Sequence, residues 1–222
     1  MNTTSGTKSF GSTGDIDVDS LKKAPANGSP SRYFDRHFQC EAAKILPGEY
    51  FATDKNMVLV TVLGSCVAAC IQDTRLNIGG MNHFMLPRRE QDPHNPVSMS
   101  ARYGTFAMEI LINQLIKMGA RRENMEAKVF GGGNVLRGFT MNSIGEANAN
   151  FVGEYLRNER IKMVAEDLLG VHPRKIYYFP TTGRVLVKKI KELHNHTIAE
   201  RESEYDMRLR NVVVGGDIEI FK

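Results

Sequence analysis

The chain has 222 residues, of which 41% are hydrophobic and 24% charged, a balance typical of a globular protein that buries a core without disulfides. Three cysteines, an odd number without regular spacing, favour free thiols in a reducing compartment over a disulfide-linked secreted fold. The net charge of +4 is too small to indicate nucleic-acid binding, and no apolar run approaches the roughly 20 residues of a membrane span, so we expect a cytoplasmic protein without membrane insertion.

Residues 1–38 are rich in Ser, Thr, Gly, Asn and Pro and lack periodic apolar positions. Such a segment buries too little apolar surface to offset the entropy lost on ordering. We therefore predict a disordered or loosely attached extension over residues 1–38 and one domain over residues 39–222, with order beginning near Ala42. Three aromatic residues of the extension are expected to anchor it or to cap the edge of the domain: Tyr33, Phe34 and Phe38.

Short apolar runs separated by turn residues predict a group of strands between positions 49 and 87. The runs that fit strands are residues 49–53, 57–62 and 78–86, whereas residues 67–71 fit either a strand or the start of a helix. The β-branched, apolar run 57–62 is typical of a strand buried on both faces. Pro87 is expected to end the last of these strands.

The second half of the chain alternates predicted helices and strands. Apolar residues at helical spacing predict a helix over residues 100–118, with Ser100 as its N-cap and Gly119 just after its end. The other expected elements are a strand at 128–130, a helix at 146–157, a strand at 161–165, a hairpin at 175–189, a charged, helix-compatible segment at 190–210 and a last strand or docking tail at 211–221. We predict an α+β fold, a layered α/β sandwich of mixed β-sheets with two main helices.

Two reactive side chains stand in the apolar stretch 58–87, Cys66 after the Gly64-Ser65 turn and His83 on a later strand. Their separation, 83 − 66 = 17 residues, lets one strand go out, turn and return, which would place thiol and imidazole side by side. The thiolate is the nucleophilic form, and His83 would take the proton of the thiol.

The surroundings of this pair favour nucleophilic attack on a carbonyl carbon. Backbone N–H groups at the Gly64-Ser65 turn would stabilise the oxyanion, and the Thr61 hydroxyl would orient the imidazole. Such a site attacks an ester or an amide, forms a thioester and releases an alcohol or ammonia.

Other interpretations of the same residues remain open. Cysteines in apolar runs are usually small buried hydrophobes, our interpretation of Cys40 and Cys70, and a lone histidine on an apolar strand is usually a core residue. Cys66, Cys70 and His83 would also offer three ligands to zinc, but the chain has no CxxC pair, and we predict no metal and no cofactor. The glycine run 131–133 lacks the Lys-Ser/Thr of a phosphate loop and is interpreted as a tight strand exit.

Six stretches carry a more specific pattern. They are LGSCVAACIQD (63–73), GGMNHFMLP (79–87), ARYGTFAMEILINQLIKMGARRENMEAKVFGGGNVL (101–136), IGEANANFV (144–152), PRKIYYFPTTGRVLVKK (173–189) and GDIEIF (216–221). In this order and spacing, from about Glu49 to Phe221, they resemble the CheD family of chemoreceptor glutamine deamidases. The resemblance implies that the nucleophile is Cys66, that its histidine is His83 and that its threonine is Thr61.

The resemblance also implies an activity and partners. Members of the CheD family convert selected glutamines on helices of methyl-accepting chemotaxis receptors to glutamate, a step in chemotaxis adaptation. Some members also hydrolyse glutamyl methyl esters or bind a CheC-type phosphatase. The implied fold is similar to cysteine-hydrolase deamidase domains such as those of cytotoxic necrotizing factor toxins. Two departures concern one face: Leu169 stands where the family commonly has glycine, and Glu146-Ala147 where many members have an arginine.

Two further functions fit the sequence. A non-catalytic adaptor for receptors or for a phosphatase needs only the protein surface. A general cysteine protease or esterase would use the same nucleophile and would differ in its product.

Overall fold

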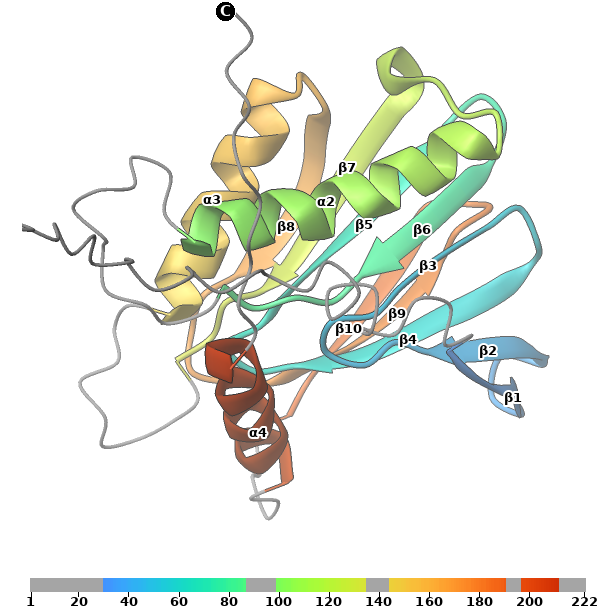
Figure 1. The fold of residues 1–222 in the computed structure, drawn as a ribbon. Coiled ribbons are helices and arrows are strands. Elements are labelled where there is room, and N and C mark those ends of the chain that lie inside the picture. The colour runs from blue at the N-terminus through green and yellow to red at the C-terminus, as the bar shows by residue number, and fades with distance from the viewer. Residues whose placement is uncertain (1–29, 87–98, 135–143, 191–196, 212–222) are drawn as a thin grey trace, which may run out of the picture.

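The computed structural model describes residues 30–86, 99–134, 144–190 and 197–211 (Figure 1). The strands are β1 (Ser31–Asp35), β2 (Cys40–Lys44), β3 (Tyr50–Thr53), β4 (Met57–Leu63), β5 (Val67–Asp73), β6 (Ile78–Asn82), β7 (Met125–Gly131), β8 (Lys162–Leu168), β9 (Arg174–Phe179) and β10 (Arg184–Lys189). The helices are α2 (Met99–Lys117), α3 (Ile144–Asn158), α4 (Thr197–Asn211) and the short 3-10 helix η1 (Arg122–Asn124). The N-terminal part of the predicted extension, residues 1–29, and nearly all of the predicted tail, residues 212–221, lie outside the described ranges.

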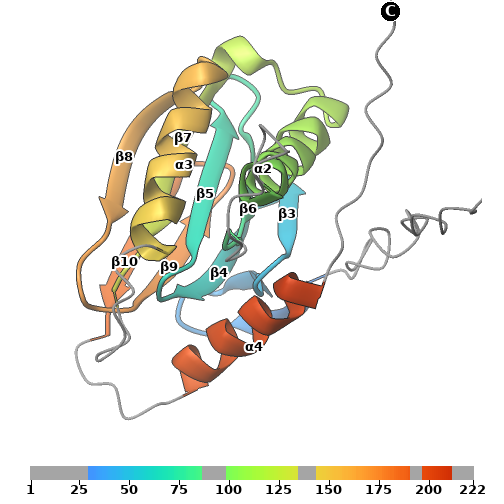
Figure 2. The same cartoon turned by 60° about the vertical axis from the view of Figure 1, so that its left-hand side comes forward.

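The strands form two mixed sheets of five strands each. The first has the order β1-β2-β4-β9-β10, in which only β2 and β4 are parallel, and the second has the order β3-β6-β5-β7-β8, in which only β7 and β8 are parallel. Helices α2 and α3 cover the outer face of the second sheet (Figures 1 and 2). The result is the predicted α+β sandwich of mixed sheets.

Two apolar cores hold the three layers together. One lies between the helices and the second sheet and includes Ile71, Leu111 and Val152. The other lies between the two sheets and includes Leu59 and Cys70. Because each strand in the middle of a sheet meets a core on one or both faces, its sequence is a nearly continuous apolar run.

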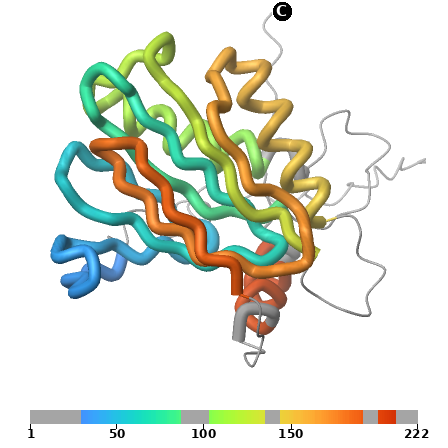
Figure 3. Tube along the Cα trace, turned by 180° about the vertical axis from the view of Figure 1, so that it is seen from behind, coloured from blue at the N-terminus to red at the C-terminus, as the bar shows by residue number. Residues whose placement is uncertain are grey.

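The middle strands confirm the apolar runs of the sequence. β4 is buried over nearly its whole length, as predicted for residues 57–62. The ambiguous run at 67–71 is a strand, which continues as β5 to Asp73. The predicted hairpin is confirmed as β9 and β10, which lie beside β4 in the first sheet when the molecule is seen from behind (Figure 3).

Three expectations need correction. Regular structure begins with β1 at Ser31, earlier than Ala42, because this edge strand is held by backbone pairing to β2 while most of its side chains are exposed. Helix α2 begins at Met99, so Ser100 lies within the helix and is not its N-cap. The charged segment 190–210 contributes a third helix, α4, beside the two that were expected.

One of the three aromatic residues near β1 has an expected role. Phe38 packs edge-on against Tyr177 and Phe179 of β9 and so caps the outer face of the first sheet. Tyr33 and Phe34 are exposed.

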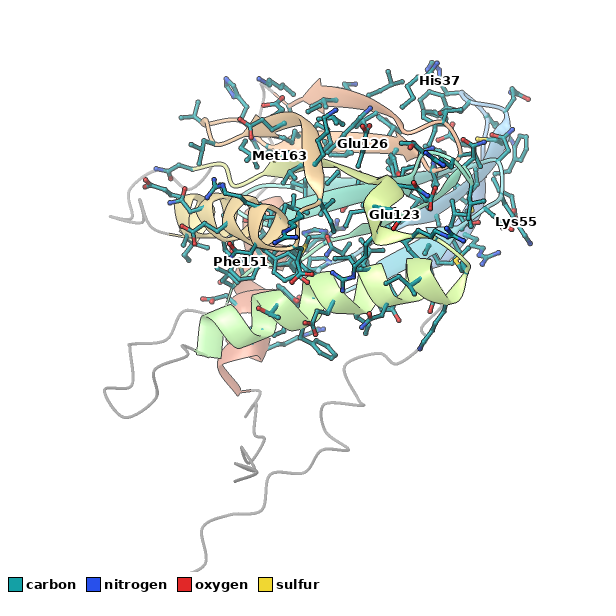
Figure 4. The ribbon with its side chains drawn as sticks, turned by 90° about the horizontal axis from the view of Figure 1, so that it is seen from above. His37, Lys55, Glu123, Glu126, Phe151 and Met163 are labelled. Atoms are coloured by element: carbon teal, nitrogen blue, oxygen red, sulfur yellow. The ribbon has the colours of Figure 1, made fainter. Side chains whose placement is uncertain are left out.

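Helices α2 and α3 contact each other as well as the sheet. Phe151 of α3, labelled in Figure 4, lies against the backbone of Gly104 in α2 and packs edge-on against Phe84. A Cβ at position 104 would collide with the Phe151 ring, so glycine permits this close approach. Across the described ranges, no helix combines the length and apolar character needed to cross a membrane.

Two of the three isoleucines of α2 test which face of the helix packs on the second sheet. Ile112 is fully buried against the second sheet, whereas Ile116, one turn later, is 39% exposed. We expect Ile112→Ala to lower the free energy of unfolding by about 3 kcal/mol, because it leaves a cavity, and Ile116→Ala to change it by less than about 1 kcal/mol. Urea denaturation of both variants measures the difference, and equal losses would contradict this packing.

Candidate active site

Three sequence-predicted residues meet at one end of the sandwich. Thr61 lies on β4 of the first sheet, Cys66 lies between β4 and β5, and His83 directly follows β6 of the second sheet. All three are buried. The structure therefore brings together residues from both sheets.

The register of β5 orients Cys66 and His83 toward the same side. Val67 and Phe84 exchange two backbone hydrogen bonds, with N to O distances of 2.9 and 3.0 Å. In such an antiparallel pair, Cys66 and His83 are diagonal neighbours on one face, with Cα atoms about 7–8 Å apart. The strand pairing expected from the spacing is present, and its register puts the two residues on one face of the paired strands.

A hydrogen-bond chain sets the tautomer of His83. The Thr61 hydroxyl lies 2.8 Å from His83 Nδ1 and donates to the carbonyl oxygen of Ile45 at 2.7 Å. Because the hydroxyl has one proton, it accepts from His83 Nδ1–H, and this network assigns the proton to Nδ1. His83 Nε2 is buried and has no hydrogen-bond partner among the described residues, so its lone pair is available as a base.

The backbone of His83 is held by the turn that precedes β3. Gly48 N–H donates to the His83 carbonyl at 2.7 Å, and His83 N–H donates to the Glu49 carbonyl at 2.9 Å. Gly48 has a φ of +84°, a conformation that favours glycine. The Pro47-Gly48 turn of the sequence thus positions the imidazole.

The turn at Gly64–Cys66 is held through its three carbonyl groups. Gly133 N–H donates to the Gly64 carbonyl and Gly132 N–H to the Cys66 carbonyl, both at 2.8 Å. The Asn148 side chain donates to the Ser65 carbonyl at 2.9 Å. With the carbonyls engaged on one side, the N–H groups of the turn are free to point to the other.

The glycine run 131–133 is a strand exit, as predicted, and also part of this support. Gly131 has a φ of +113°, and a Cβ there would collide with the Cys66 carbonyl oxygen. A side chain at this position would therefore displace the candidate nucleophile.

Asn148 of α3 was not identified from the sequence. It is fully buried, and its side-chain oxygen accepts from Leu86 N–H at 2.7 Å while its NH₂ group binds Ser65. It thereby joins the turn before Cys66 to the segment after His83. The sequence feature that could have identified Asn148 is its position as a polar residue among the apolar residues of one helix face, Ile144, Val152 and Tyr155.

Glu202 of α4 was also missed. Figure 2 shows α4 lying across the end of the sandwich at which β4 meets β5, and Glu202 is only 5% exposed there. Its carboxylate accepts hydrogen bonds from the N–H groups of Gly64, Ser65 and Cys66 at 2.9, 2.9 and 3.1 Å. Because residues 190–210 contain many charged side chains, the sequence alone could not distinguish this buried carboxylate from the exposed ones.

The electrostatics of the closed site keep Cys66 and His83 uncharged at neutral pH. Burial, and then the negative charge of Glu202, raise the pKa of the Cys66 thiol well above its ordinary value. Burial lowers the pKa of His83 to about 4, although the Glu202 charge acts in the opposite direction. With α4 in place, the site therefore holds a neutral thiol and a neutral imidazole.

A pocket of about 280 Å³ adjoins the site on the side of Thr61 and His83. Its rim carries the basic side chains of Lys44, Lys175 and Arg201. Among the described residues, which include all three zinc ligands considered above, no cluster of His, Cys, Asp or Glu could hold a metal ion.

Comparison with known proteins gives a consistent picture. The sequence model of the family described as "CheD chemotactic sensory transduction" matches residues 85–189, a range that excludes Thr61, Cys66, His83 and Glu202. A protein of Thiobacillus denitrificans named "Probable chemoreceptor glutamine deamidase CheD" is 65% identical over 189 residues, 85% of this chain and 94% of the relative. A match of this length includes the stretch from Thr61 to His83 wherever it begins.

Two other relatives are similar over longer stretches. A protein of Shewanella oneidensis named "Probable chemoreceptor glutamine deamidase CheD 1" is 60% identical over 196 residues, 88% of this chain and 95% of its own length. One of Laribacter hongkongensis, with the same name as the Thiobacillus protein, is 54% identical over 204 residues, 92% of this chain and 99% of its own.

The low pKa of His83 predicts a pH dependence of stability. Between pH 6.5 and 4 the imidazole is protonated in the unfolded chain but not in the folded one, so the free energy of unfolding falls as the pH drops through this window. His83 should account for a loss of about 3 kcal/mol, which is complete near pH 4. Denaturation at pH 7.5 and 4.5 should show a smaller loss in His83→Gln than in the wild type, with His37→Gln, an exposed histidine, as the control. Equal losses in wild type and His83→Gln would refute the buried neutral imidazole.

Proposed function

Because this chain belongs to the CheD family, we propose that it is a chemoreceptor glutamine deamidase, which hydrolyses the side-chain amide of selected glutamines on cytoplasmic helices of methyl-accepting chemotaxis receptors. The observation that carries the proposal is the buried Nε2 of His83, which has no hydrogen-bond partner in the described part of the chain and lies on the same face as Cys66, with Nδ1 held by Thr61. A base and a nucleophile on one face are the minimum for covalent attack on an amide.

The first step is attack of Cys66 on the glutamine side chain. Sγ forms a bond to the amide carbon, and the thiol proton passes to His83 Nε2. The low basicity of the enclosed imidazole and the high pKa of the thiol both oppose this transfer while the site is enclosed and Glu202 is present. Binding of a neutral amide in place of the carboxylate removes the negative charge that disfavours the thiolate.

The turn before Cys66 stabilises the tetrahedral intermediate. Gly64 N–H and Cys66 N–H already converge on a single oxygen of Glu202, at 2.9 and 3.1 Å. The oxyanion would accept hydrogen bonds from the same two donors, and removal of one such donor typically costs about 3 kcal/mol of transition-state stabilisation. Because Gly132, Gly133 and Asn148 hold this turn, the donors need no reorganisation during the reaction.

The second half of the reaction returns the proton and adds water. The imidazolium gives its proton to the departing nitrogen, ammonia leaves, and a thioester joins Cys66 to the substrate. Water then attacks the thioester with His83 as base, yielding glutamate and the free thiol. A glutamyl methyl ester follows the same route with methanol as leaving group, and we include it as a second substrate. A CheC-type phosphatase partner remains a prediction of the family resemblance.

Two buried cysteines, Cys66 just before β5 and Cys70 within β5, test the identity of the nucleophile. Cys66→Ala should lower deamidation by at least about a thousandfold, whereas Cys70→Ala, which removes a buried thiol four residues later, should retain activity. The measurement is the gain of about one dalton per converted glutamine in a purified receptor fragment, with release of ammonia and no peptide cleavage. Persistent ammonia release by Cys66→Ala would refute the assignment, and released peptides would favour a protease.

Substitutions of Thr61 test whether its hydroxyl orients the imidazole of His83. Thr61→Val removes the acceptor for His83 Nδ1–H while preserving side-chain volume, and should lower kcat about tenfold to a hundredfold. Thr61→Ser keeps the hydroxyl and should restore most of the activity. Steady-state kinetics on the receptor fragment separate the two variants, and similar rates for both would exclude an orienting role.

A further inference from the structure

The carboxylate of Glu202 occupies the same N–H groups that the proposed function assigns to the oxyanion. One carboxylate oxygen accepts from Gly64 N–H at 2.9 Å and Cys66 N–H at 3.1 Å. The other accepts from Ser65 N–H at 2.9 Å and from the Ser65 hydroxyl at 2.7 Å.

The packing of one face of helix α4 against the domain positions this carboxylate. Its buried residues recur at the spacing of one helical face and are Glu202, Asp206 and Leu209, with Tyr205 half-buried beside them. Leu209 joins the core between the two sheets, and the Tyr205 hydroxyl is hydrogen-bonded to Tyr103 of α2. The neighbouring side chains Ser203, Glu204 and Met207 are exposed. An amphipathic helix is therefore docked across the site with one polar side chain inserted into it.

The inserted group matches the proposed substrate in shape. A glutamate side chain differs from a glutamine side chain only by an oxygen in place of the NH₂ group, and it is identical to the reaction product. A Cβ at Gly64 would collide with the Glu202 carboxylate, so the absence of a side chain at position 64 leaves room for this group.

We propose that α4 is an internal substrate mimic, which occupies the groove for a substrate helix and places Glu202 where the reacting glutamine carboxamide binds. The proposal rests on the deamidase function proposed above. It identifies the substrate as a side chain presented on a helix, and it makes displacement of α4 a condition for binding the receptor. The structure thus represents a self-occupied form of the enzyme.

The hydrogen bonds explain why the mimic binds well and does not react. The carboxylate uses all four donors of Gly64, Ser65 and Cys66, whereas a carboxamide has only one acceptor oxygen and meets the Ser65 N–H with its own NH₂ group. A carboxylate is also a poor electrophile, and its charge disfavours the thiolate beside it. Glu202 therefore competes with glutamine without being consumed.

Conversion of the mimic into a substrate is the most direct test. In full-length Glu202→Gln the introduced amide should react with Cys66, lose ammonia, form the thioester and be hydrolysed by water to the carboxylate. Intact-mass and peptide analysis should show a gain of about one dalton at position 202, or a loss of about 17 daltons if the thioester accumulates. The matched control Glu204→Gln, on the exposed face of the same helix, should keep its amide, as should the double variant Cys66→Ala/Glu202→Gln.

The Glu202→Gln protein also distinguishes an error in the role proposed for α4 from an error in the proposed deamidase function. If the amide at position 202 persists while the protein deamidates a receptor fragment, α4 does not occupy the substrate groove and the inference is wrong. If neither amide is converted, the deamidase function itself is refuted, and the inference with it.

Competition with the receptor gives a second, independent measurement. Glu202→Ala removes the inserted carboxylate and should lower KM for the receptor fragment about tenfold or more, with little change in kcat, because a larger fraction of the enzyme is free to bind. Glu204→Ala removes the same charge from the exposed face and should leave both constants unchanged. Alkylation of Cys66 by iodoacetamide, followed on its own peptide, should be faster in Glu202→Ala than in Glu204→Ala. An unchanged KM together with unchanged alkylation would overturn the competition.

Discussion

The site depends on how the backbone of Gly64–Cys66 is held. Its three carbonyl groups are bound by Gly132, Gly133 and Asn148, and its three N–H groups consequently converge on one carboxylate. A flexible turn would lose such a geometry to conformational entropy, and donors that reorient during a reaction contribute less to the rate. The rigid strands β5 and β7, which pair along their full length, deliver the two sides of this arrangement.

The turn after β8 holds a leucine in a conformation that favours glycine. Leu169 has a φ of +61°, where a residue with a side chain costs about 1–2 kcal/mol relative to glycine. Its N–H nevertheless donates to the Gly131 carbonyl at 2.9 Å, and its own carbonyl accepts from the buried Arg174. Arg174 also forms an ion pair with Asp167 at 3.0 Å. These contacts hold the leucine in a conformation that glycine adopts freely, so the support of the glycine run is preserved.

The sequence predicted what depends on neighbouring residues and missed what depends on distant ones. The apolar runs around Gly64 predicted β4 and β6 and left β5 as one of two alternatives, and the 17-residue spacing predicted the strand pairing that puts Cys66 and His83 on one face. The contact of Asn148 with Ser65 spans 83 residues, and that of Glu202 with Cys66 spans 136. No local pattern encodes such contacts, and the composition of α4 is that of a solvated helix. β1 was missed for a related reason, since its backbone pairing leaves no mark on its mostly exposed side chains.

The proposed catalytic residues are divided between the two sheets. Thr61 belongs to the first sheet, through β4, whereas Cys66 and His83 are attached to β5 and β6 of the second. Between them lies an apolar interface without a strand that crosses from one sheet to the other in the described core. A sliding motion of one sheet over the other would separate the Thr61 hydroxyl from the imidazole while every backbone ladder stayed intact. The hydrogen bond that orients His83 therefore depends on the relative position of the two sheets.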